Sequence, residues 1–159
     1  MNKKINKVAI IGSGIMGSRI ACHFANIGIK VVLLDIIPSE CLNNNNLIND
    51  KSLRNKIVDN ALRSTLTSKP SPIYLKSFAH RIETGNITDN LNLISDADWI
   101  IEAVIEKIEI KKEIFLQIEK YRKKGTIVSS NTSGIPINSM IEGRSDEFSQ
   151  HFCGTHFFN

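Results

Sequence analysis

The sequence has 159 residues, a formal net charge of +4, 42% hydrophobic and 23% charged side chains. This balance is typical of a folded globular protein, and the length suits one domain with a sizeable core. Lysine and arginine are scattered, which favours solvated surface charge over a nucleic-acid-binding stripe, although a few lysines could meet the phosphates of an anionic substrate. No apolar stretch approaches membrane-spanning length. We therefore expect neither nucleic acid nor a membrane as partner.

The three cysteines, Cys22, Cys41 and Cys153, are far apart, and no two form a Cys-x-x-Cys pair. An odd number of separated cysteines predicts free thiols in a reducing compartment, not a disulfide framework or a zinc site. The N-terminal lysines are followed at once by a strand pattern that belongs to the fold, so we expect no signal peptide. The composition thus favours a cytoplasmic protein without a metal.

A glycine-rich segment follows the first predicted strand and reads Gly-Ser-Gly-Ile-Met-Gly over residues 12–17. Gly12 allows a tight turn, Gly14 lets backbone amides approach a diphosphate, and Gly17 lets the next helix lie close to the sheet. Such turns also occur as plain packing devices. The surrounding strand, helix, strand and acid favour dinucleotide binding.

The helix expected from Ile15 to about Ile27 directs its unpaired amides, including those of Ile15 and Met16, at the same diphosphate. Gly28 predicts a left-handed helix stop. Helical spacing places one set of apolar side chains on the sheet: Ile20, Ala21, Phe24, Ala25 and Ile27.

The second strand, Val31 to Leu34, is continuously apolar, as expected of a strand buried on both faces, and Asp35 follows it. A carboxylate here can accept both hydroxyls of an adenosine ribose and would repel a 2′-phosphate. No arginine follows to bind such a phosphate, since the next residues are Ile36, Ile37 and Pro38. We therefore expect NAD, not NADP, as the cofactor.

The remaining chain predicts further strands and helices in alternation. Residues 38–72 form a polar insertion, with one or two helices and an asparagine run at 43–46 to which we assign no chemistry. Later strands are expected at 81–84, with a turn at Gly85-Asn86, and at 97–104, 126–129 and 152–157; helices are expected at 106–121 and 135–142. The longer helix has one apolar face, formed by Ile110, Ile114, Phe115, Ile118 and Tyr121. This alternation predicts the α/β class: a Rossmann-type doubly wound, mostly parallel sheet in a single domain, residues 1–159.

Two polar segments, 129–134 and 154–159, lie at the ends of predicted strands, where open α/β sheets bind ligands. The first could instead be a turn that caps the next helix. In the second, His156 could be a satisfied core residue.

Four motifs occur in a recognisable order: the glycine loop with Asp35, Ile-Glu-Ala-Val-Ile-Glu at 101–106, Ser-Asn-Thr-Ser at 130–133 and His-Phe-Phe-Asn at 156–159. Together they closely resemble the N-terminal NAD-binding domain of L-3-hydroxyacyl-CoA dehydrogenases, over essentially the whole chain. The insertion and the residues around Asp98-Trp99 are more similar to large bacterial forms fused to an enoyl-CoA hydratase.

The resemblance implies a role for each matching residue. His156 would be the general base that takes the proton of the substrate's 3-hydroxyl, and Ser133 would hydrogen-bond the reacting oxygen. Asn159 would lie beside the nicotinamide, and Glu106 and Lys111 would contact the cofactor. For these last two, and for Lys111 in particular, surface positions on the helix are the alternative.

The resemblance also implies (3S)-hydroxyacyl-CoA oxidation to 3-oxoacyl-CoA in fatty-acid β-oxidation. It implies an acyl-CoA substrate and a C-terminal helical domain, absent from this chain, that completes the pocket and contributes to a homodimer. Without that domain and its glutamate partner for His156, we expect good NAD binding and weak turnover. Two alternatives stay open: a non-catalytic NAD-binding or assembly module, and another 3-hydroxyacid dehydrogenase.

Overall fold

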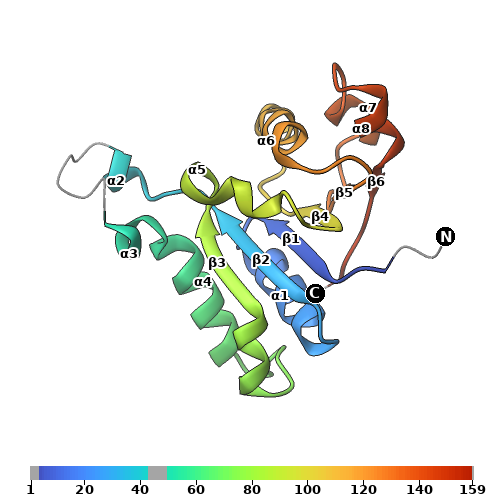
Figure 1. Ribbon diagram of the computed structural model, residues 1–159. Coiled ribbons are helices and arrows are strands. Elements are labelled where there is room, and N and C mark those ends of the chain that lie inside the picture. Colours follow the sequence, from blue (N-terminus) through green and yellow to red (C-terminus); the bar gives the residue numbers. More distant parts are fainter. Residues whose placement is uncertain (1–3, 43–49, 159) are drawn as a thin grey trace.

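The computed structural model describes residues 4–42 and 50–158, so the asparagine run at 43–46 lies outside the described residues. Its centre is one sheet of six parallel strands in the order β3-β2-β1-β4-β5-β6 (Figure 1). The strands are β1 (Lys7–Ile11), β2 (Lys30–Asp35), β3 (Ile82–Asn86), β4 (Trp99–Glu102), β5 (Ile127–Ser130) and β6 (Phe152–Gly154). This order confirms the doubly wound Rossmann-type sheet.

Helices cover both faces of the sheet, with α1 and α4 on one face and α6, α7 and α8 on the other (Figure 1). The α-helices are α1 (Ile15–Asn26), α2 (Ser39–Leu42), α3 (Lys51–Arg54), α4 (Lys56–Thr67), α5 (Ile87–Asn90), α6 (Ile108–Tyr121), α7 (Ile137–Met140) and α8 (Asp146–Gln150). Two 3-10 helices span Lys76–Arg81 and Leu91–Ile94. Among the described residues, no helix has both the length and the apolar character needed to cross a membrane.

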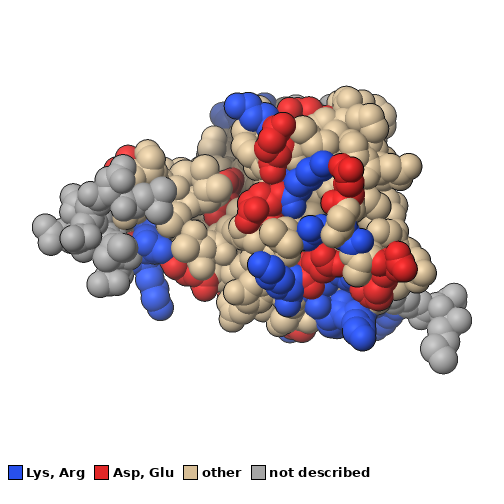
Figure 2. Space-filling view, turned by 90° about the horizontal axis from the view of Figure 1, so that it is seen from above, with Lys and Arg blue, Asp and Glu red and all other residues tan. Residues whose placement is uncertain are grey.

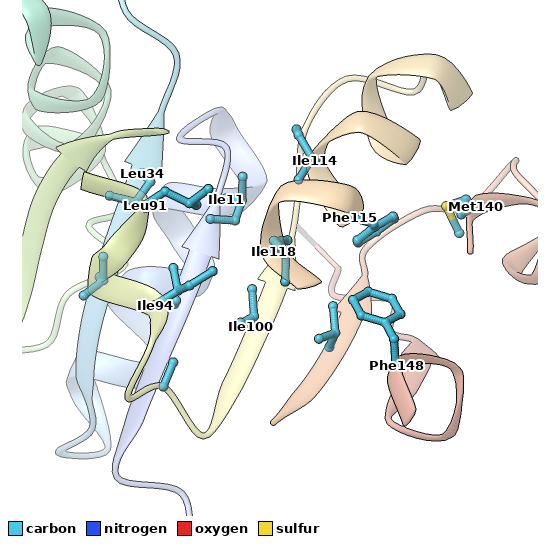
Figure 3. Packing of buried hydrophobic residues seen from close by; sticks show 14 residues of the cluster. Ile11, Leu34, Leu91, Ile94, Ile100, Ile114, Phe115, Ile118, Met140 and Phe148 are labelled. Carbon is cyan, nitrogen blue, oxygen red and sulfur yellow. The ribbon is translucent and has the colours of Figure 1, made fainter. Parts of the chain in front are cut away.

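Alternate side chains of the central strands enter two separate cores, because successive residues of a strand point to opposite faces. Ile11 and Leu34 belong to the core on the α6 side of the sheet, together with Leu91, Ile100 and Ile118, and Leu34 lies beside Leu91 (Figure 3). The opposite core, under α1 and α4, contains Val8, Ile10, Ala21, Phe24, Val31, Leu33 and Val58. Burial on both faces explains the continuous apolar runs in these strands.

The sheet changes winding direction between β1 and β4, which lie side by side in parallel register. Beyond their ends, the backbone amide of Ala103 donates to Ile11 O at 2.8 Å, whereas that of Gly12 donates to Leu34 O at 2.7 Å. The segments that follow β4 and β1 thus stay attached to the neighbouring strands just beyond the strand ends. In open α/β sheets the ligand crevice lies outside the carboxyl ends of the strands, at the point where the winding direction changes.

Several expected boundaries are wrong. Gly85 and Asn86 do not form a turn; they pair with Leu34 and Asp35 as the end of β3, because β2 offers a full edge up to Asp35. The last strand ends at Gly154 instead of continuing to 157, because its neighbour β5 ends at Ser130. The longer helix begins at 108, not 106, and α8 was not expected at all.

The first helix matches its expected start and stop, and Gly28 has the left-handed φ of 89°. Four of the five apolar residues assigned to its inner face are buried: Ile20, Ala21, Phe24 and Ala25. Ile27 is 59% exposed, because the helix ends at Asn26 and the following turn directs this side chain away from the sheet.

Candidate cofactor-binding and active site

The glycine loop is shaped by close backbone contacts. A Cβ atom at Gly12, whose φ is 103°, would lie 2.7 Å from Ala103 O, and one at Gly17 would lie 1.8 Å from Gly12 O. A Cβ at Gly14 would meet nothing within 4 Å. Gly12 and Gly17 are therefore required for packing, whereas Gly14 leaves open space at the mouth of the loop. The packing roles of Gly12 and Gly17 are those expected from the sequence, and the approach of a diphosphate at Gly14 stays a prediction.

The N-terminus of α1 faces this open space with its backbone donors available. Gly14 is the N-cap and supplies no side-chain acceptor, and the first turn contains no acidic residue. The first helical bond that reaches back to the cap is from Ser18 N to Gly14 O, at 3.0 Å. The amides of Ile15 and Met16 precede Ser18, the first amide that donates to this cap, so they stay available to an anion at the helix N-terminus.

Asp35 lies at the end of β2, and its carboxylate is clasped by the glycine loop. Its Oδ2 atom accepts hydrogen bonds from Ser13 N at 2.6 Å and from Ser13 Oγ at 2.5 Å. Its Oδ1 atom accepts one from Ile36 N at 2.7 Å. Asp35 is half-buried.

An apolar groove of about 870 Å³ begins next to this carboxylate, at Ile36, and runs along α6. Ile110 and Tyr121, which we assigned to the inner face of that helix, line the groove and are 37% and 48% exposed. Ile114, Phe115 and Ile118 form the face that is buried as expected. The groove offers an apolar surface that begins at the residue following Asp35.

A buried carboxylate, Glu102, organises the end of β4. Its side chain is 0% exposed and accepts hydrogen bonds from Val104 N and Lys111 Nζ, each at 2.7 Å, and from Ser130 Oγ at 2.5 Å. Lys111 is 1% exposed, so the alternative of a surface lysine is wrong. A buried ion pair with this many partners satisfies its hydrogen-bonding capacity and joins β4, β5 and α6 at one point.

Glu106 connects the same lysine to the Ser-Asn-Thr-Ser segment. Its Oε1 atom accepts hydrogen bonds from Thr132 Oγ1 and from Gly134 N, the latter at 3.0 Å, and its Oε2 atom lies 3.4 Å from Lys111 Nζ. Burial alone would raise the pKa of Glu106, but these three partners together lower it below its ordinary value. Ser133 lies between the two residues that Glu106 holds. Its exposed side chain therefore sits on a loop fixed from both sides.

The Ser-Asn-Thr-Ser segment does not cap the next helix. Helix α7 begins after Pro136, and no side chain bonds its N-terminus. Thr132 Oγ1 accepts only a long bond, 3.4 Å, from Ile135 N. The alternative of a capping turn is therefore wrong, and the polar side chains of this segment serve the strand-end contacts described above.

The segment after β6 leaves the sheet while it is still attached to β5. Thr155 N donates to Ser130 O at 2.9 Å, and Phe157 N donates to Asn131 Oδ1 at 2.8 Å. Phe157 packs against Phe24 and Trp99, with ring centroids 6.3 and 6.4 Å apart. His156, between these anchors, is exposed, so the alternative of a satisfied core histidine is wrong. Asn159 lies outside the described residues.

Basic side chains of two short runs, at 111–112 and 122–124, are paired with acidic neighbours. Lys112 pairs with Glu142 at 2.8 Å and Lys123 with Asp98 at 2.9 Å, and Arg122 pairs with Glu147. On the face seen in Figure 2, basic and acidic side chains lie next to one another. This intermixing agrees with solvated and paired surface charge.

Comparison with known proteins identifies this arrangement. The family model described as "3-hydroxyacyl-CoA dehydrogenase, NAD binding domain" matches residues 7–159. The chain belongs to this family. NAD is therefore its cofactor, and the open cradle at Gly14, the free amides of α1 and the carboxylate of Asp35 all fit that dinucleotide.

Relatives of this NAD-binding domain include longer proteins. A probable 3-hydroxyacyl-CoA dehydrogenase of Bacillus subtilis is 48% identical over 163 residues, and a putative fatty acid oxidation complex trifunctional enzyme of Rickettsia felis is 40% identical. Each match covers 100% of this chain and 21% of the relative. The crystal structure of 3-hydroxybutyryl-CoA dehydrogenase from Escherichia coli is 30% identical, with a TM-score of 0.68, over 99% of this chain and 30% of that one. The chain thus spans about a fifth of the first two relatives.

Sequence reasoning missed two residues of this NAD-binding domain, Glu102 and Ser13. A signal for Glu102 was present, because a charged residue inside the apolar strand Trp-Ile-Ile-Glu must find a buried partner. Ser13 gave no comparable signal, since a serine between two glycines is ordinary in a turn.

Proposed function

We propose that this domain takes part in the oxidation of (3S)-hydroxyacyl-CoA to 3-oxoacyl-CoA, a step of fatty-acid β-oxidation. One observation carries the proposal: the segments containing Ser133 and His156 leave adjacent parallel strands at the edge where the glycine loop also lies. The bond from Thr155 N to Ser130 O joins the two segments. The names of the Bacillus and Rickettsia relatives agree with this chemistry.

In the proposed cofactor site, the amides of the glycine loop and of α1 bind the diphosphate, and Asp35 accepts hydrogen bonds from the adenosine ribose. The adenine lies in the apolar groove that begins at Ile36. Glu106 and Asn159 contact the nicotinamide half, and Lys111, whose ammonium group is buried between Glu102 and Glu106, holds Glu106 in position. When bound, NAD supplies the hydride acceptor.

In the proposed reaction, the imidazole of His156 removes the proton from the substrate's 3-hydroxyl group while the hydride on C3 leaves for the cofactor. The O–H and C3–H bonds break and a C=O bond forms, so the substrate loses one proton and one hydride. Ser133 donates a hydrogen bond to the reacting oxygen and orients it. In the reverse direction, His156 returns the proton to the developing alkoxide.

The proposal includes partners that complete the site. Since His156 and Ser133 are exposed, a C-terminal helical domain is needed to exclude water and to bind the acyl-CoA, and we propose that it also supplies dimer contacts. The large bacterial form fused to an enoyl-CoA hydratase remains our preferred parent, in line with the share of the relatives that this chain spans. Cys22 and Cys41 are buried free thiols, which supports a reducing, cytoplasmic setting.

The test uses a chimera in which this chain replaces its matching segment in the Bacillus subtilis relative. Reduction of acetoacetyl-CoA is followed by the loss of NADH absorbance, with the chain alone assayed in parallel. We expect the chimera to be active and the chain alone to be weakly active. His156→Gln should abolish turnover in the chimera and leave NADH affinity unchanged. His80→Gln, which changes an exposed histidine at the opposite edge of the sheet, should preserve both. Near-normal turnover of His156→Gln would overturn the proposed reaction.

A further inference from the structure

The hydrogen bonds that Asp35 already accepts leave few acceptor positions for the hydroxyl groups of a ribose. An ionised carboxylate has about four lone-pair positions, two on each oxygen. Ser13 N and Ser13 Oγ occupy both positions on Oδ2, and Ile36 N occupies one on Oδ1. A single acceptor position therefore remains, although a ribose presents two neighbouring hydroxyl groups.

Two of the three donors cannot leave. Ser13 N belongs to the glycine loop, which is held to β2 by the bond from Gly12 N to Leu34 O at 2.7 Å, and Ile36 N adjoins Asp35 in the chain. The Ser13 hydroxyl is the only one of the three that can rotate. Ser13 is 1% exposed, however, so a hydroxyl turned away from Asp35 would lose a charge-assisted bond without gaining water.

We propose that Ser13 sets the strength with which the adenosine ribose is recognised, because its hydroxyl occupies the position on Asp35 that the second ribose hydroxyl would need. This inference rests on the proposed role of Asp35 as the ribose acceptor. In the wild type, Asp35 binds one hydroxyl group strongly and the second only at the cost of displacing Ser13. Without the Ser13 hydroxyl, both would bind.

Loss of the buried hydrogen bond between the Ser13 hydroxyl and Asp35 should tighten NADH binding, because it frees an acceptor position for the ribose. Ser13→Ala is expected to lower the Kd for NADH by about threefold to tenfold. This is the gain expected when one ribose hydroxyl can bond the charged Asp35 without competing with the Ser13 hydroxyl. A purely structural role of Ser13 would instead weaken binding or leave it unchanged. Ser13→Gly removes the same hydroxyl and provides a second variant if Ser13→Ala does not fold.

The decisive measurement compares NADH with analogues that lack the 2′ or the 3′ hydroxyl of the adenosine ribose, by calorimetric titration of the chain. Loss of one ribose hydroxyl from the nucleotide should raise the Kd about threefold in the wild type, and about tenfold or more in Ser13→Ala. Ser18→Ala is the matched control. The Ser18 hydroxyl is buried in the same turn and donates to Ser13 O at 2.6 Å, without touching Asp35, so the wild-type ratio should persist.

An Asp35→Ala variant separates the proposed ribose contact from the proposed effect of Ser13 on it. If the penalty for a missing hydroxyl persists in Asp35→Ala, the proposed ribose contact itself is wrong. If Asp35→Ala removes the penalty but Ser13→Ala leaves it at the wild-type value, or binds NADH more weakly, the role of Ser13 alone is overturned.

Discussion

Lys111 and Glu102 form an ion pair of 2.7 Å whose two side chains are 1% and 0% exposed. The two residues are nine positions apart, on α6 and β4, and Glu106 extends the pair to the loop that carries Ser133. Charged groups removed from water in this way are costly to leave unpaired. The pair therefore links the stability of the fold to the geometry of the proposed site.

The first prediction concerns this pair. Glu102→Gln or Lys111→Met should each destabilise the chain by about 3–5 kcal/mol, because each leaves one buried group without its charged partner. The double variant should recover much of that loss, since no isolated charge remains. Urea unfolding of the four proteins gives the coupling energy directly.

The adjacent pair, Lys112 and Glu142, is the control for this cycle. Its nitrogen and oxygen are almost as close, at 2.8 Å, but the side chains are 40% and 76% exposed. Lys112→Met should hardly change the urea midpoint. Equal effects at Lys111 and Lys112 would contradict the importance that we give to burial.

The second prediction separates two glycines of the same loop. Gly14→Ala should leave the unfolding free energy nearly unchanged, because the added Cβ meets no atom within 4 Å, and should weaken NADH binding at least about tenfold by filling the diphosphate space. Gly17→Ala should destabilise the fold by about 1–3 kcal/mol or more, since its Cβ would lie 1.8 Å from Gly12 O. Thermal unfolding and NADH titration of both variants provide the check. A stable Gly14→Ala protein with wild-type affinity would show that the diphosphate binds elsewhere.

The third prediction concerns the choice between NADH and NADPH. The wild type should bind NADH at least about tenfold more tightly, because the Asp35 carboxylate repels a 2′-phosphate at the ribose. Asp35→Asn keeps the shape and removes the charge, so it should reduce this preference mainly by improving NADPH binding. Titration of both proteins with both nucleotides tests the expectation. Comparable affinities of the wild type for NADH and NADPH would remove the role given to Asp35.

The fourth prediction concerns acid stability. Two hydrogen bonds from the Arg54 guanidinium, both 2.6 Å, hold the pKa of Asp89 below its ordinary value. A carboxyl group with a lowered folded-state pKa stabilises the fold fully above its unfolded pKa, and this contribution disappears as the pH falls through the folded pKa. The urea midpoint should therefore fall as the pH drops below about 4, the ordinary pKa of an aspartate. Asp89→Asn should be less stable at pH 7 and lose less stability on acidification.

Glu83, an exposed carboxylate on β3, provides the comparison for this measurement. Glu83→Gln should retain the acid slope of the wild type. If Asp89→Asn and the wild type lose stability in parallel, the Arg54 contact does not contribute to acid sensitivity.

The central βαβ unit could be predicted in detail because its determinants are local. Apolar runs, the glycine turn and Asp35 lie within residues 8–35, and each acts on neighbours in the chain. Boundaries that depend on a partner strand were less predictable. Gly85 and Asn86 have turn-forming side chains, yet they extend β3 because β2 presents donors and acceptors beside them.

The sequence by itself determined the alternation of strands and helices, the cofactor motif and the family resemblance, because these features depend on residue type and spacing along the chain. Tertiary structure alone decided that Lys111 is buried, that Glu102 is its partner, and that Ser13 binds Asp35. Burial and hydrogen bonding depend on which segments meet across the sheet. The pairs concerned are 9, 22 and 28 positions apart in the chain: Lys111 with Glu102, Ser13 with Asp35, and Ser130 with Glu102. They become partners only when the parallel strands bring their carboxyl ends to one edge.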